Sequence, residues 1–132
     1  MNSVRADYRK HRLRILPFIT GAQQRNKDPF ADQIDRALLE CRAFLFLCGG
    51  GFYVLQPTLR NGVVWVNIMF AQSLGQCVLS TYLSDIHQLT RQIGGRGIEL
   101  FTTVERLSGF LRRQGFSQDS SNDRVQHWIK EL

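Results

Sequence analysis

The order of segments between residues 63 and 116 constrains the fold of this chain more than any other feature. Val63–Ala71 is an apolar segment rich in β-branched and aromatic residues, which predicts a buried β-strand. Apolar residues then recur at helical spacing from Cys77 to Ile93, and Ile98–Thr102 is a second apolar segment. A strand, a long crossover helix and a second strand place the two strands parallel to each other. We therefore predict a central parallel β-α-β unit.

The junction between the first strand of this unit and its helix contains Gly75. A helix N-terminus has backbone N–H groups without intrahelical partners, and the helix dipole is positive there. Such a junction can bind a phosphate or another anion. The alternative interpretation is that Gly75 only permits a tight turn from strand to helix.

Upstream of the unit, the pattern predicts a helix followed by a meander of strands. The weak alternation of Leu13–Ile19, interrupted by Pro17, indicates a short edge strand. Residues 20–27 form a predicted loop, and Asp28 and Pro29 are typical of the N-cap and first position of a helix. The predicted buried face of this helix consists of Phe30, Ile34, Ala37, Leu38 and Cys41.

Two strands separated by glycines precede the central unit. Phe44–Cys48 and Phe52–Leu55 flank three consecutive glycines, and residues 57–62 end in Asn-Gly, which favours a hairpin turn. These two hairpins predict antiparallel strands that lead into the strand beginning at Val63. The predicted fold class is therefore α/β (α+β), a mixed, mostly antiparallel sheet with a central parallel β-α-β unit and flanking helices.

The length of 132 residues is sufficient for one domain with one core, so we predict a single domain over residues 1–132. Residues 1–12 form a basic N-terminal arm within it. Residues 117–132 form a C-terminal tail, in which 117–123 are polar and expected to be mobile. Residues 125–132 form a short amphipathic segment that packs on the sheet or on another subunit.

The segment from the first strand to Phe116 resembles the acyl-CoA-binding core of the GNAT superfamily of N-acetyltransferases. The family signature is Gln or Arg, two free positions, Gly, one free position, then Gly or Ala; Gln72 and Gly75 match it, and Cys77 departs from it. The helix ending Gly115-Phe116 resembles the helix that closes with Gly-Phe in many members. The pattern is also similar to that of small phage-encoded proteins of this type.

The resemblance implies a GNAT-like fold, acetyl-CoA as the cofactor and N-acyl transfer to an unknown acceptor as the activity. In the family, the backbone amides of this loop hold the pyrophosphate of the cofactor. The cofactor-binding residues that it implies are Gln72, Ser73, Leu74, Gly75, Gln76 and Cys77.

Acyl transfer to an amine needs a base for the ammonium and usually an acid for the leaving thiolate. Family members commonly place a tyrosine four residues before the glycine of Gly-Phe, and this chain has Leu111 there. Asn67 is the polar residue of the first strand, and Glu99 lies on the next strand. We take Glu99 and Asn67 as candidate catalytic residues, although a lone carboxylate such as Glu99 is more often a solvated surface group.

Several functions other than catalysis remain open. The chain can be a catalytically inactive GNAT-fold protein with a structural or binding role, as in a phage virion. It can also bind a protein partner or form a homo-oligomer. The formal charge is +6, and basic residues crowd the first fifteen positions, so nucleic acid is a further candidate partner.

The composition of the chain bears on where the protein is expected to be located and on whether it is expected to bind a metal. No segment approaches the about 20 apolar residues of a membrane-spanning helix, so we expect a cytoplasmic protein without membrane contact, or a virion-associated one if it is phage-encoded. The cysteines, Cys41, Cys48 and Cys77, have neither paired spacing nor a nearby histidine cluster, so no metal site is predicted. Cys41 and Cys48 are expected in the core. Cys77, near a helix N-terminus, is a candidate nucleophile.

Overall fold

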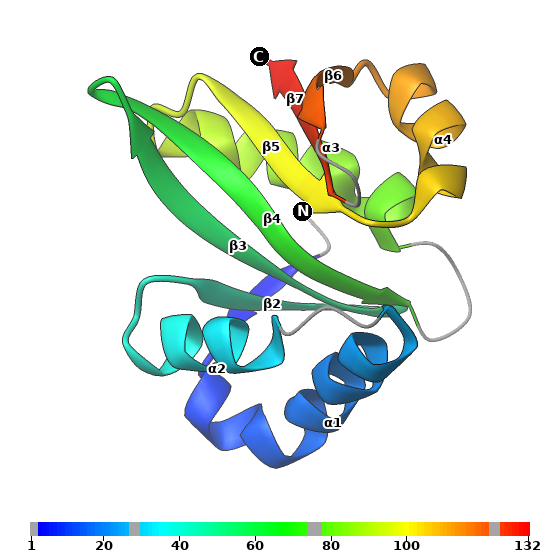
Figure 1. Ribbon diagram of the computed structural model, residues 1–132. Helices are drawn as coiled ribbons and strands as arrows, with labels where there is room; N and C mark the ends of the chain where they lie inside the picture. Colours follow the sequence, from blue (N-terminus) through cyan, green and yellow to red (C-terminus); the bar gives the residue numbers. More distant parts are fainter. Residues whose placement is uncertain (1–2, 27–29, 74–77, 122–124) are drawn as a thin grey trace.

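The computed structural model describes residues 3–26, 30–73, 78–121 and 125–132, and within them the chain forms one mixed β-sheet covered by helices on both faces (Figure 1). The seven strands lie in the order β1-β2-β3-β4-β5-β7-β6. The strands are β1 Val4–Ala6, β2 Phe44–Cys48, β3 Gly51–Arg60, β4 Val63–Ser73, β5 Gly97–Thr102, β6 Ser117–Ser121 and β7 Gln126–Glu131. The helices are α1 Tyr8–Asn26, α2 Ala31–Leu39, α3 Val78–Gln92, the 3₁₀ helix η1 Glu105–Leu107 and α4 Ser108–Arg113.

The predicted parallel β-α-β unit is confirmed. Residues 65–68 of β4 pair in parallel with residues 97–100 of β5, whereas every other pair of neighbouring strands is antiparallel within the described residues. Helix α3 connects the two strands, and Gly94, with φ of 75°, lies just beyond its last turn. The mixed, mostly antiparallel sheet with flanking helices is the predicted fold class.

The meander of β2, β3 and β4 is also confirmed, but its second turn is shorter than predicted. Only Asn61 and Gly62 form the turn, both with positive φ (53° and 79°), and Pro57 lies inside β3. The sheet tolerates Pro57 because β2 pairs with β3 only as far as Leu55, so the missing N–H of the proline interrupts no ladder.

The N-terminal prediction was wrong. The predicted strand at 13–19 and residues 20–26 of the predicted loop are parts of α1, which extends to Asn26 and contains Pro17. The buried side chains of α1 recur at helical spacing, and this periodicity outweighed the local cost of one proline. They are Tyr8, Ile15, Ile19 and Ala22.

The basic residues 1–12 were predicted to form an arm. The described part of this segment, from Ser3, forms β1 and the beginning of α1.

The predicted helix start at Asp28 and Pro29 lies outside the described residues, and α2 begins at Ala31. Ile34, Ala37 and Leu38 are buried in α2 as predicted, whereas Cys41 is exposed in the turn that follows. Cys48 is half-buried.

The C-terminal tail is folded into the sheet. Residues 117–121, predicted to be mobile, form the edge strand β6, and β7 inserts between β5 and β6. The prediction failed because an edge strand needs no apolar side chains when its partner supplies the hydrogen bonds. Trp128 of β7 is fully buried, and the predicted amphipathic segment is a strand within the sheet of this chain.

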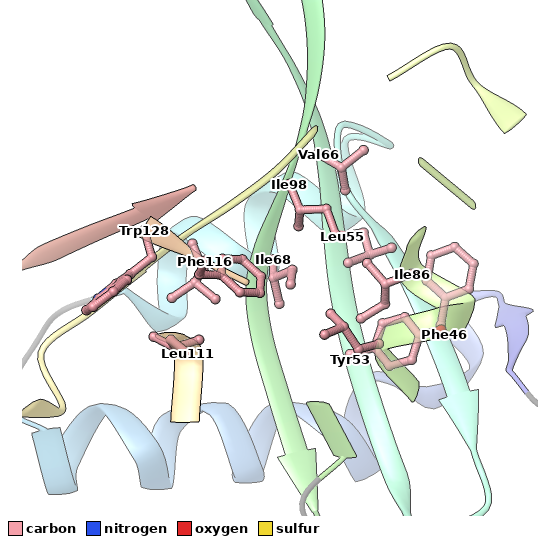
Figure 2. Close-up of a cluster of buried hydrophobic side chains, with 12 residues drawn as sticks. Phe46, Tyr53, Leu55, Val66, Ile68, Ile86, Ile98, Leu111, Phe116 and Trp128 are labelled. Atoms are coloured by element: carbon pink, nitrogen blue, oxygen red, sulfur yellow. The ribbon is translucent and has the colours of Figure 1, made fainter. Parts of the chain in front are cut away.

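Each face of the sheet has its own core. Figure 2 shows the cluster beneath α3 and α4, where Ile86, Leu111, Phe116 and Trp128 pack on the sheet. The second cluster lies beneath α1 and α2 and includes Ile19 and Ile34. None of the helices in the described part of the chain combines the length and apolar character needed to cross a membrane.

Candidate active site at the fork between β4 and β5

Strands β4 and β5 diverge after a short parallel ladder, and a pocket lies where they separate. Their pairing ends at Ile68 and Leu100, although β4 continues to Ser73, and the two strands open apart in Figure 1. The pocket has a volume of about 380 Å³ and is called the fork pocket below. It is lined by Phe30, Gln33, Ile34, Asn67, Ile68, Met69, Phe70, Ala71, Phe101, Thr102, Thr103 and Val125.

A β-bulge in β4 lies at the same place. Val54 of β3 is paired with Phe70 and Leu55 with Ile68, so Met69 is the extra residue. A bulge bends its strand and interrupts the ladder, which leaves backbone polar groups without their regular partners. Met69 lines the fork pocket, so these groups lie beside the opening.

Glu99 is buried, so its interpretation as a solvated surface acid was wrong. The residue is 6% exposed and is the register neighbour of Asn67 across the parallel ladder. Arg60 Nη2 donates to Glu99 Oε2 in an ion pair. The other carboxylate oxygen, Oε1, lies 3.8 Å from His127 Nε2. The structure therefore brings together the two candidate catalytic residues, Glu99 and Asn67.

The Arg60 guanidinium is held in place by Trp65. Its Cζ lies 4.7 Å from the centre of the Trp65 ring, a cation–π contact. The ring in turn packs over Gly97, where a Cβ atom would lie 2.6 Å from the indole and 2.5 Å from the Lys130 carbonyl oxygen. Only glycine fits at this position without displacing Trp65 or the β7 backbone.

His127 connects Glu99 to the surface. Its Nδ1 lies 3.2 Å from Asp119 Oδ2, and its ring stacks on Phe101 with a centroid distance of 4.3 Å and an interplanar angle of 4°. The side chain of Asp119 is 47% exposed, whereas that of His127 is 12% exposed. A carboxylate, an imidazole and a second carboxylate thus form a chain from solvent to the buried side of β5.

Sequence analysis missed His127 and Arg60. The signal for His127 was the alternation of residues 126–131, in which Trp128 faces one side of the sheet and His127 the other. Arg60 carried no such signal, because it was assigned to a turn. Its contact with Glu99 spans 39 positions of the chain.

Asn67 presents an unused hydrogen-bond acceptor. Its Oδ1 is buried and has no hydrogen-bond partner among the described residues, and the residue lines the fork pocket. Leaving a buried amide oxygen unpaired costs about 1–3 kcal/mol. A ligand with an N–H group in the pocket would remove this cost.

The predicted cofactor loop is only partly described. Gln72 and Ser73 are the last residues of β4 and pair with Phe52 and Gly51. Residues 74–77, which include Gly75 and the Cys77 thiol, lie outside the described residues. Their role in binding a pyrophosphate stays a prediction.

Leu111 does not face the fork pocket. It is fully buried between α4 and the sheet, in the cluster with Phe116 and Trp128 (Figure 2). The residues with hydroxyl groups that line the pocket are Thr102 and Thr103. Thr102 Oγ1 accepts a hydrogen bond of 3.0 Å from the Val104 N–H.

Comparison with known proteins identifies the fold. No family model and no curated protein matches the chain. Among solved structures, it resembles a GNAT-family acetyltransferase of Listeria monocytogenes, with 13% identity, a TM-score of 0.67, and coverage of 96% of this chain and 91% of the other. A GNAT-family acetyltransferase of Desulfovibrio desulfuricans gives 15% identity and a TM-score of 0.68, with coverage of 98% and 96%.

An acetyltransferase of Bacillus subtilis in complex with CoA gives 16% identity and a TM-score of 0.63, covering 80% of this chain and 86% of the other. At these identities the likeness concerns the fold. The protein has the GNAT fold, and the predicted resemblance is confirmed at that level.

Proposed function

We propose that this protein is an acyl-CoA-dependent N-acyltransferase whose active site is the fork pocket. The observation that carries the proposal is the divergence of β4 and β5 after Ile68 and Leu100, with a bulge, a pocket and the buried Asn67 Oδ1 at the same place. Several proteins with this fold were solved with CoA or acetyl-CoA bound, including the Bacillus subtilis acetyltransferase.

The slot between the strands is suited to the cofactor's chain. A strand end that leaves its neighbour exposes backbone groups to which an extended amide-containing chain can hydrogen-bond. Gln72 and Ser73 end β4, and we propose that the backbone amides of the segment from Gln72 to Cys77 bind the pyrophosphate. When bound, acetyl-CoA supplies the acyl thioester that the amine attacks.

Acyl transfer forms a C–N bond and breaks the C–S bond of the thioester. The acceptor ammonium loses one proton to become a nucleophile and a second after the C–N bond has formed. One proton goes to the leaving thiolate and the other to solvent. The site has to orient the amine and accept its first proton, and orientation alone can supply a large part of the rate.

Glu99 is the proposed proton acceptor, acting through a water molecule. Its Oε1 is not used by Arg60 and faces His127, which contacts the exposed Asp119. His127, 3.8 Å from Glu99, and Asp119 therefore mark the direction from Glu99 to solvent that does not pass through the pocket. Asn67 orients the amine, because its Oδ1 accepts a hydrogen bond from one N–H group of the amine.

The test begins with cofactor binding. We expect acetyl-CoA to bind in isothermal titration calorimetry and, at about a hundred times its dissociation constant, to stabilise the protein by about 2.7 kcal/mol in thermal unfolding. Gly75→Val should weaken binding at least tenfold without altering the circular dichroism spectrum, because the added side chain would occupy the space next to the phosphates. Gly50→Val is the matched control, since a Cβ there meets nothing within 4 Å.

Thiol release from acetyl-CoA in the presence of amines then tests catalysis. Binding without turnover for any amine would mean that the fold retains the cofactor but not the reaction. The absence of binding at millimolar acetyl-CoA would overturn the proposal. It would favour an inactive structural or binding protein, such as a virion component, for which the basic N-terminal residues are the first surface to test.

A further inference from the structure

The walls of the fork pocket combine aromatic side chains with polar but uncharged ones. Phe30 immediately precedes α2, Phe70 belongs to β4 and Phe101 to β5, and the ring centroids of Phe30 and Phe70 lie 6.1 Å apart. Gln33, Asn67 and two threonines supply the polar groups. None of the described residues that line the pocket carries a charged side chain.

The buried carboxylate of Glu99 does not offset this neutrality for a bulky cation. Glu99 lies behind the pocket wall and is already paired with Arg60. The chain as a whole carries a formal charge of +6. A polyamine or aminoglycoside would bring several ammonium groups to a positive protein and desolvate them without a carboxylate partner among the described lining residues, which is unfavourable.

The rim of the pocket is aromatic and rigid. Phe101 is 53% exposed, although large apolar side chains are usually covered. It cannot turn inward freely because its ring stacks on His127. An exposed aromatic ring fixed at the mouth of a pocket is suited to contact with an apolar group of a ligand.

Asn67 adds one polar requirement. Its buried Oδ1 lacks a hydrogen-bond partner, so the ligand has to supply a donor at that point and apolar surface elsewhere. A single N–H donor on an apolar body satisfies both conditions.

From these observations we propose that the acceptor is a primary amine whose neighbouring substituent is apolar or aromatic and otherwise uncharged, with the amine donating to Asn67 Oδ1 and the substituent packing among Phe30, Phe70 and Phe101. This inference rests on the proposed function, because it assigns the acceptor of the same site. Free amines and the N-terminus of a peptide that begins with an apolar residue share this chemistry.

The first experiment compares acceptors at saturating acetyl-CoA. Phenylalaninamide and leucinamide represent free amines, a tripeptide amide beginning with phenylalanine represents the N-terminus, and spermidine and Nα-acetyllysine are the comparison. We expect kcat/KM at least tenfold higher for the apolar amines. Comparison of phenylalaninamide with the tripeptide distinguishes the two sources of acceptor.

Two variants test the residues. Gln33→Glu places a carboxylate at the exposed rim without disturbing the core, and should shift the kcat/KM ratio of spermidine to phenylalaninamide about three- to fivefold toward spermidine, as expected for an exposed charge pair. Gln92→Glu, an equal charge change at the exposed end of α3, should leave the ratio unchanged. Asn67→Leu should raise KM for every amine about tenfold or more with unchanged acetyl-CoA binding.

Direct binding separates this inference from the proposed function. Chemical-shift changes in Phe101, Thr102 and Thr103 on titration with phenylalaninamide report occupation of the pocket whether or not turnover occurs. A preference for spermidine in an active protein would overturn the acceptor assignment and leave the acyltransferase function intact. If acetyl-CoA does not bind, absence of these shifts would overturn the assignment as well, and their presence would support a pocket for apolar amines independent of acyl transfer.

Discussion

Two polar clusters lie on the same side of the sheet, and they differ in how completely their atoms are paired. The first, here called the helix clamp, consists of Tyr8, Arg12 and Asp35 and joins α1 to α2. Tyr8 Oη donates to Asp35 Oδ1 at 2.6 Å, and Arg12 donates to both carboxylate oxygens at 2.9 Å. Each of these three hydrogen bonds joins two members of the clamp.

The second, here called the fork cluster, consists of Asn67, Glu99 and His127. Asn67 Oδ1 is buried without a hydrogen-bond partner among the described residues, and His127 Nε2 lies 3.8 Å from Glu99, beyond hydrogen-bonding distance. A buried polar group that no protein atom satisfies costs stability unless a water molecule or a ligand pairs with it. From this comparison we infer that the helix clamp stabilises the fold, and we propose that the fork cluster serves the proposed reaction.

The largest expected effect is on the rate. Glu99→Gln should lower kcat/KM by about 10²–10⁴-fold, since a positioned base contributes that much. The melting temperature should change little, because glutamine keeps the shape and Arg60, 37% exposed, can be solvated. Glu40→Gln is the matched control, because Glu40 forms an exposed ion pair with Arg42. Unchanged turnover in Glu99→Gln would contradict the proposed role of the fork cluster in the reaction.

Replacement of Leu111 by tyrosine tests whether a residue on the face of the sheet covered by α3 and α4 can take part in the reaction. Leu111→Tyr should destabilise the protein by about 1–3 kcal/mol in urea unfolding, because the larger ring and its hydroxyl enter a filled core. We expect no increase in turnover, since Leu111 does not line the fork pocket. Leu59→Tyr, at a position that is 76% exposed, controls for the residue type. An increase in kcat would show that α4 moves the side chain toward the cofactor.

A substitution in the helix clamp should lower the stability of the protein and leave its rate unchanged, which is the reverse of the effect expected for Glu99→Gln. Asp35→Ala should lower the free energy of unfolding by about 1–3 kcal/mol, because Tyr8 loses its hydrogen-bond acceptor in a buried position. The kcat/KM value and acetyl-CoA affinity should stay the same. Asp32→Ala, at an exposed position of the same helix, serves as the control. A loss of activity without a loss of stability would contradict the structural role of the clamp.

The smallest effect concerns acid pH. Hydrogen bonding by Arg12 holds the pKa of Asp35 below its ordinary value. A carboxylate whose pKa is lowered on folding adds stability above its unfolded pKa of about 3.9 and loses it as pH falls through the folded value. The stability difference between the protein and Asp35→Ala should therefore be full at pH 6 and shrink below about pH 4. A difference independent of pH in urea unfolding would exclude this linkage.

The sequence by itself determined the elements whose signals lie within neighbouring residues. The apolar segments at Val63–Ala71 and Ile98–Thr102, with the helical spacing between them, predicted the parallel unit. The Asn61-Gly62 turn and the buried face of α2 followed in the same way. These predictions succeeded because each depends on the periodicity or turn chemistry of one contiguous stretch.

Only the tertiary structure decided which residues surround Glu99 and that residues 8–26 form the helix α1. Glu99 contacts Arg60 from β3 and His127 from β7, and its burial depends on strands whose order in the sheet no local pattern states. Pro17 lies inside a helix because the buried contacts of Ile15 and Ile19 with the sheet outweigh one lost hydrogen bond. Burial and pairing between distant segments are properties of packing, since they arise only when the sheet assembles and removes these side chains from water.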